Sequence, residues 1–243
     1  MIKSPKIENL INGFSYEWLR LDRHKNMDVN VEEYEDYTRF VKEDMFNETY
    51  EFMKYILVND LSILNFIDSD FVVINRPLNQ IYELELPEED KLPEGSDQKD
   101  HERKLLSERT FRKVMLDKES RRGGLITQAG ILMMTTNGEF TNPFYRGAWV
   151  AENIYGHKLT VPTNLEIGVL DPPSEPFTIK DNINEHRKDP NCATCHSKMD
   201  PFGLAMENFD VLGRYRETYQ LSLIHISEPT RRTPISYAVF CLK

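Results

Sequence analysis

The 243-residue sequence has no apolar run that approaches the length needed to cross a bilayer. Its first residues, Met-Ile-Lys-Ser-Pro-Lys, lack the apolar core of a secretory signal peptide. Basic residues are also scarce: 30 Lys and Arg against 40 Asp and Glu give a net charge of −10, with no basic stripe to offset it. These absences exclude a transmembrane segment from this stretch of sequence and argue against a nucleic-acid-binding surface.

Several catalytic signatures are missing as well. No glycine-rich loop has the spacing that cradles phosphate, and no serine stands in a nucleophile elbow. The carboxylates are scattered, without a pair that the sequence places at the separation a glycosidase needs. There is no internal repeat. The sequence therefore specifies no reaction, and whether the protein is an enzyme stays open.

The composition that is present is globular and the periodicity is helical. Apolar residues make up 40% of the chain and the mean hydropathy is −0.55, which is typical of one large or two small folded domains. Prolines and dense charge mark residues 85–110 as a linker. We predict helices at 7–23, 31–58, 125–134 and 143–155, and brief strands at 72–74 and 111–116.

One motif is specific: Cys192-Ala-Thr-Cys195-His196. Cysteines three residues apart lie on one side of a helix, at a spacing that matches the two vinyl groups along one edge of haem. A histidine directly after the second cysteine comes under the iron as its proximal ligand. The motif predicts haem c attached through Cys192 and Cys195, with His196 as an axial iron ligand.

Two other interpretations of these cysteines stay open. A Cys-x-x-Cys pair can form a redox disulfide, although the βαβ context of a thioredoxin is missing. Cys192, Cys195, His196 and His186 also make a zinc ligand set, although without zinc-finger spacing. In either case the protein would be a binding or scaffold module rather than an electron carrier.

The second axial ligand of the iron is not fixed by the sequence. Met206, His186 and His157 are weak candidates, and a buried methionine is more often a core side chain. Met206 would reach the opposite haem face only if the chain folded back. An open position, which would suit a peroxidase-like reaction, or a ligand from sequence beyond this chain fits equally well.

The segment after the motif is expected to begin a new helix at Pro201, with Asp200 as its cap. Four charged residues follow, and they either pair with one another or bind the haem propionates, for which the arginine fork is suited. These residues are Glu207, Asp210, Arg214 and Arg216.

The last residues do not read as native protein. Back-translated, 221–231 and 235–242 resemble, in order, two segments of a transposon-end adapter used in short-read sequencing libraries. We therefore interpret 221–243 as an adapter artefact rather than an amphipathic tail, and exclude it from fold reasoning. His225 and Cys241 then carry no functional weight, and the natural protein is expected to continue beyond Gln220.

Long ordered motifs resemble one group of proteins. The runs 122–129, 142–156, 186–196 and 200–210 resemble the planctomycete cytochrome-c-associated domains of unknown function, and 61–75 is similar to the domain that precedes them. Such domains build large multidomain proteins of planctomycetes and related bacteria. The resemblance implies an exported protein with further cytochrome-like domains, and it carries over only the three motif residues as haem-attachment residues.

The sequence therefore predicts a mostly α fold. Residues 1–110 would be the C-terminal part of a helical domain plus linker, and 111–220 a small c-type cytochrome-like helical domain. The expected function is one-electron transfer through the haem iron, to a redox partner protein or an adjoining cytochrome domain. Haem attachment of this type takes place outside the cytoplasmic membrane. We therefore expect a periplasmic or exported protein whose signal peptide is missing from this sequence.

Overall fold

The computed structural model describes residues 4, 6–35, 37–85, 109–159, 188 and 190–217. They belong to two compact units, Met1–Ile131 (unit 1) and Leu132–Lys243 (unit 2), which we describe separately. The adapter-like tail, His186 and most of the predicted linker lie outside the described residues. No helix among the described residues is long and apolar enough to cross a membrane.

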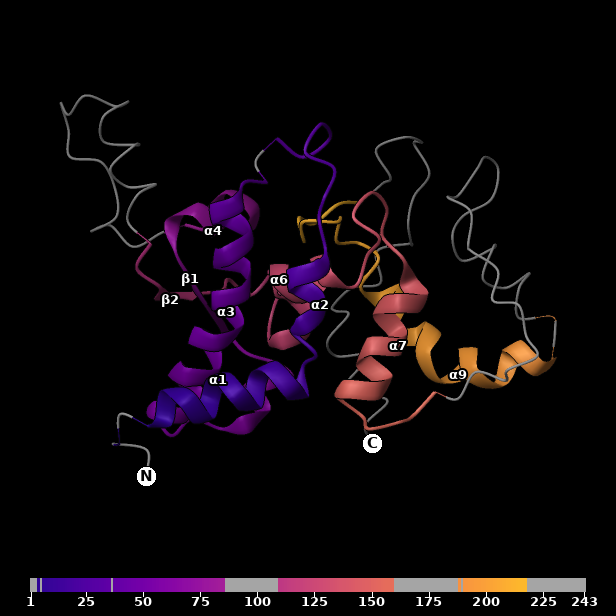
Figure 1. The fold of residues 1–243 in the computed structure, drawn as a ribbon, viewed down its shortest axis with the longest axis horizontal. Helices are drawn as coiled ribbons and strands as arrows, with labels where there is room; N and C mark the ends of the chain where they lie inside the picture. The colour runs from indigo at the N-terminus through magenta and orange to yellow at the C-terminus, as the bar shows by residue number, and fades with distance from the viewer. Residues whose placement is uncertain are drawn as a thin grey trace. The chain divides into compact units, whose positions relative to one another are not determined.

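Unit 1 is built around a long central helix, against which α1 packs (Figure 1). Thr38 caps this helix by accepting a hydrogen bond from the Val41 amide at 3.2 Å, so the helix starts later than the predicted residue 31. Asn75 caps the next helix in the same way, from the Leu78 amide at 3.1 Å. The helices are α1 (Ile7–Trp18), α2 (Asp22–Asn26), α3 (Arg39–Val58), the 3₁₀ turn η1 (Ile63–Phe66) and α4 (Arg76–Tyr82).

A two-stranded antiparallel sheet lies beside α3. Strand β1 (Phe71–Ile74) pairs with β2 (Arg112–Met115), with Phe71 opposite Met115 and Ile74 opposite Arg112. All of β1 is buried, as expected for a short apolar strand beneath a helix. The Lys113 ammonium of β2 lies 4.6 Å from the centre of the Phe71 ring of β1, a cation–π contact between the two strands.

A buried polar network, the Glu48 cluster, joins α3 and α4 to residues 122–129. The Tyr82 hydroxyl donates to Glu48 and accepts from the Ala129 amide at 3.0 Å. The Arg122 guanidinium lies 4.1 Å from the Tyr82 ring centre and donates to the Thr127 carbonyl at 3.1 Å. The cluster is completed by a hydrogen bond of 2.7 Å between Thr49 and Gln128.

A glycine is required at the point where residues 122–129 meet η1. Gly124 has a φ of +66°, and an added Cβ would lie 2.5 Å from the Ile67 carbonyl oxygen. Any side chain there would be both strained and in collision with the main chain. The Gly123-Gly124 pair is therefore a docking turn for η3 (Leu125–Thr127) and the helix α6 (Ala129–Met134) that follow.

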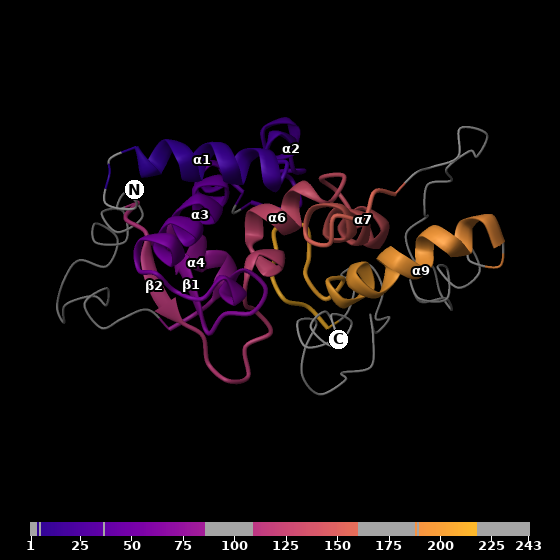
Figure 2. The same ribbon diagram turned by 90° about the horizontal axis from the view of Figure 1, so that it is seen from below.

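Unit 2 is centred on two helices that cross at close range (Figures 1 and 2). These are α7 (Pro143–Asn153), capped by the Asn142 side chain, and α9 (Pro190–Ala205). A Cβ added at Gly147 of α7 would lie 2.2 Å from the Met199 carbonyl oxygen, and one at Gly203 of α9 only 1.8 Å from that of Pro143. The two glycines let the helix backbones touch.

The helix-rich fold class is confirmed, with the two-stranded sheet as the regular β structure of the described residues. The compact units divide at Ile131, whereas the sequence suggested a boundary after residue 110. Residues 112–129 belong to unit 1 because β2 pairs with β1 and because residues 122–129 contact α3 and α4. The cytochrome-like character of the second domain stays a prediction.

Candidate functional site

The Cys-x-x-Cys-His motif lies in the first turns of α9, the part of the helix that extends past α7 in both views (Figures 1 and 2). The α-helical backbone places Cys192 and Cys195 on the same side of one turn. The Cys195 thiol is partly exposed and forms no disulfide. The backbone therefore has the register that the predicted haem attachment needs.

His196, the next residue, is held in one orientation. Its Nδ1 lies 2.8 Å from the Asp200 Oδ1, and both side chains are buried. The edge of the ring packs against Phe144 of α7, with the ring centres 4.5 Å apart. A carboxylate is an acceptor, so Nδ1 is the ring nitrogen that donates in this pair.

This arrangement fits an iron ligand. Histidines that bind metals almost always donate the other ring N–H to a carboxylate or carbonyl, which fixes the tautomer and makes the ligand more basic. The donor chemistry of Cys192, Cys195 and His196 therefore agrees with a covalently attached haem. Haem would bind through Nε2 of His196.

The expectation that a new helix begins at Pro201 is wrong. Helix α9 runs continuously through Pro201 to Ala205, so Asp200 lies inside the helix rather than capping it. A proline at this point removes only one amide donor, and contacts with α7 hold the helix on both sides of it. Asp200 is thus four residues from His196 on the same helix face. The sequence analysis missed this role, although the spacing of the two residues was its signal.

A buried arginine of α7 holds the segment that follows α9. The Arg146 side chain is fully buried, and its Nη1 donates to the carbonyls of Met206 and Phe209 at 2.7 Å. Its Nη2 donates to the Asp210 carbonyl at 2.8 Å. These carbonyls belong to the chain just after α9, where buried main-chain acceptors need hydrogen-bond donors. Arg146 therefore ties α7 to the end of α9.

The acidic residues after α9 are engaged within the unit. The buried Glu207 carboxylate lies 3.7 Å from Arg146 and 3.4 Å from Arg216, and it accepts from the Thr141 hydroxyl. Asp210 Oδ1 accepts from two main-chain amides, those of Leu212 and Arg214. Pairing with one another is seen for Glu207 and Arg216, whereas the Asp210 carboxylate is held by main-chain amides.

Of the three candidate second ligands, the structure describes Met206 and His157. Met206 follows ten residues later beyond a continuous helix, about 15 Å along its axis, so the chain does not fold back there. His157 is exposed, with its ring 6.1 Å from that of Tyr155. His186 lies outside the described residues.

The zinc alternative depends on side chains outside the described set. Among the side chains that the structure describes, no group of three or more His, Cys, Asp or Glu is placed to hold a metal ion. That set includes Cys195 and His196 but neither His186 nor the side chain of Cys192.

The chain is thus helix-rich, and its cysteine–histidine motif lies on α9, which packs against α7. Residues 1–84 match a family described as a protein of unknown function, DUF1592, under the name PSD4. Residues 122–219 match a second such family, DUF1588, under the name PSCyt3. These are the planctomycete-type cytochrome-c-associated domains that the sequence resemblance indicated. No curated protein and no solved structure matches the chain.

Proposed function

We propose that unit 2 carries one haem c on α9 and passes single electrons through it. The observation that carries the proposal is the buried His196–Asp200 pair, which presents Nε2 as a basic ligand directly after two cysteines in helical register. When bound, the haem supplies the one-electron chemistry. The protein supplies attachment, orientation and a fixed axial donor.

Each cysteine has the same role in attachment. Its thiol adds across one vinyl group: sulfur bonds to the carbon next to the ring and the thiol hydrogen goes to the terminal carbon. This addition needs no external oxidant or reductant. The i and i+3 spacing of Cys192 and Cys195 on the helical backbone would suit attachment along one edge of the ring. His196 would hold the iron, and Asp200 would keep the proton at Nδ1.

The proposal extends to location and partners. Because thioether attachment of haem takes place outside the cytoplasmic membrane, the protein would be periplasmic or exported. Its electrons would go to a redox protein or to an adjoining cytochrome-like domain. The PSCyt3 match covers residues 122–219 and therefore includes the motif.

The test uses the full chain exported behind a signal peptide in a host with a haem-maturation system. We expect a Soret band that stays with the polypeptide after denaturation. The single variants Cys192→Ala and Cys195→Ala should each lose one thioether and weaken attachment. Cys241→Ala, a cysteine outside the motif, should behave as the parent chain. A colourless chain that holds zinc, or a disulfide between Cys192 and Cys195, would instead support the binding or scaffold module.

A further inference from the structure

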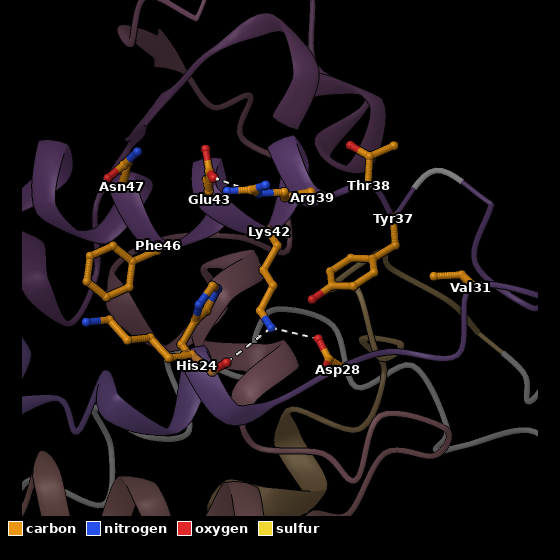
Figure 3. A pocket seen from close by; sticks show the side chains of 11 residues that line it. His24, Asp28, Val31, Tyr37, Thr38, Arg39, Lys42, Glu43, Phe46 and Asn47 are labelled. Atoms are coloured by element: carbon orange, nitrogen blue, oxygen red, sulfur yellow. Dashed lines mark hydrogen bonds and ion pairs between the residues drawn. The ribbon is translucent and has the colours of Figure 1, made fainter.

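Unit 1 contains a pocket of about 650 Å³ that the proposed haem chemistry does not use. It lies between α2, the 28–38 segment and the first turns of α3 (Figure 3). We call it the His24 pocket, after the buried histidine beside it. Its lining includes Asp28, Tyr37, Lys42 and Phe46.

Two buried polar atoms at this pocket have no hydrogen-bond partner among the described residues: His24 Nε2 and the Tyr37 hydroxyl. The His24 side chain is 3% exposed and Tyr37 is 8% exposed. Buried polar groups are nearly always hydrogen-bonded, and leaving one without a partner costs about 1–3 kcal/mol. Figure 3 shows the Tyr37 side chain directed toward the Lys42 ammonium and the His24 ring beside the Lys42 side chain. A ligand in the pocket would satisfy both atoms.

Both groups are uncharged at neutral pH. Burial, with a smaller contribution from the Lys42 charge, lowers the pKa of His24 to about 4. Burial, followed by the nearby Asp28 carboxylate, raises the pKa of Tyr37 above its usual range. Each therefore has one hydrogen to donate. Three cationic residues line the pocket, and Lys42 is half-buried whereas Lys25 and Arg39 are exposed.

Lys42 has a weakly held counter-ion. Its Nζ donates to Asp28 at 2.7 Å and to the Lys25 carbonyl at 3.2 Å. The Lys42 side chain is only 21% exposed, whereas that of Asp28 is 87% exposed. An ion pair with one partner in solvent contributes about 0–1 kcal/mol, so another carboxylate can replace Asp28 at low cost. The aromatic ring of Phe46, packed 5.6 Å from His24, provides an apolar wall.

We propose that the His24 pocket binds a small organic carboxylate with an apolar body. Its carboxylate replaces Asp28 on the Lys42 ammonium and accepts hydrogen bonds from Tyr37 and from the Nε2–H tautomer of His24. The apolar body lies against Phe46. Every residue that holds the ligand belongs to unit 1, so the inference does not depend on haem in unit 2.

The first experiment is calorimetric titration of the full chain with benzoate and hexanoate, and with the neutral analogues benzyl alcohol and 1-hexanol. At least one carboxylate should bind, and its alcohol should bind at least about tenfold more weakly, because the alcohol cannot pair with Lys42. Nitrogen NMR of His24 should show the Nε2–H tautomer in the complex. Absence of binding by both carboxylates, or equal binding of acid and alcohol, overturns the proposal.

Two substitutions separate this site from a general attraction of anions. Lys42→Met should weaken carboxylate binding about tenfold or more, while Lys118→Met, which removes an exposed lysine elsewhere, should change nothing. Asp28→Asn removes the competing carboxylate and should tighten binding. Because Asp28 is exposed, this variant is expected to fold even if Lys42→Met does not. Weaker or unchanged binding by Asp28→Asn contradicts the proposed exchange of carboxylates.

Discussion

Asp200 holds the imidazole of His196 across one turn of α9, with 2.8 Å between Oδ1 and Nδ1. The pair is buried at the place where α9 meets Phe144 of α7. It decides which nitrogen can bind a metal. It also determines how strongly that nitrogen donates, since a carboxylate partner gives the ring some imidazolate character.

The Asp200→Asn substitution tests this relationship in the haem-loaded protein. An amide in place of the carboxylate makes His196 a weaker donor, which favours the reduced iron. The reduction potential should rise by on the order of 60 mV, the equivalent of a tenfold change in equilibrium for one electron. Spectroelectrochemical titration measures it. Ser197→Ala, at an exposed position on the same helix, is the control, and an equal shift in that variant would contradict the role of Asp200.

Arg146→Met removes the guanidinium that binds three carbonyls after α9. The buried carbonyls then lose their cationic partner and Glu207 loses one of its two arginine neighbours, so the free energy of unfolding of unit 2 should fall by about 3–5 kcal/mol. Denaturant unfolding followed by circular dichroism measures the loss. Lys198→Met removes an exposed positive charge from α9 and should change stability by less than about 0.5 kcal/mol. Similar losses in both variants would mean that charge, not the carbonyl contacts, explains the effect.

Gly203→Ala tests the close crossing of α7 and α9. The new Cβ would lie 1.8 Å from the Pro143 carbonyl oxygen, so the helices must separate, at a cost of about 1–3 kcal/mol. Gly13→Ala is the matched control, because Gly13 is in α1 and has nothing within 4 Å of its added Cβ. That substitution should stabilise the chain by about 0.5–1 kcal/mol. Thermal unfolding of the two variants should therefore shift in opposite directions, and a shift in the same direction is inconsistent with this packing.

The buried carboxyl of Glu48 should make the stability of unit 1 depend on pH. Burial raises the pKa of its carboxyl from 4.5 to about 8 in the folded protein, against the smaller lowering effect of the Tyr82 hydrogen bond. Between these values the folded state keeps a proton that the unfolded state has released. The contribution of this proton to the free energy of unfolding is therefore complete below pH 4.5. It is lost as the pH rises through 8, by up to about 1.4 kcal/mol per pH unit.

Glu48→Gln removes the titrating group and keeps its shape. As the pH rises from 5 to 8, the parent chain should lose unfolding free energy relative to this variant. Urea unfolding at a series of pH values gives the curve. Glu119→Gln, at an exposed position, should follow the parent chain. A difference that is constant over this range would show that Glu48 titrates normally.

Local patterns in the sequence were sufficient to predict many of the helices and strands. The helix predicted at 143–155 is α7, because Asn142, Pro143 and the apolar spacing all act within a few residues. The predicted strands at 72–74 and 111–116 are β1 and β2. The prediction of a helix from residue 31 was wrong in its start, since apolar spacing alone does not show that Thr38 turns its side chain to cap α3.

Contacts between distant residues were beyond the sequence analysis. The three carbonyls that Arg146 binds lie 60 to 64 residues away, and no local pattern connects them. The His24 pocket likewise depends on how α2 and the 28–38 segment pack against α3. The motif on α9 was readable because its chemistry lies within five consecutive residues. Its partner Asp200 was assigned to a cap because Pro201 was taken as a helix start.

The intact mass of the exported chain, measured after denaturation and removal of unbound pigment, tests the haem proposal most directly. The account predicts the polypeptide mass plus one haem, lost when both Cys192 and Cys195 are replaced and retained when Cys241 is replaced. A mass equal to that of the bare polypeptide, in a host that matures other c-type cytochromes, would contradict it.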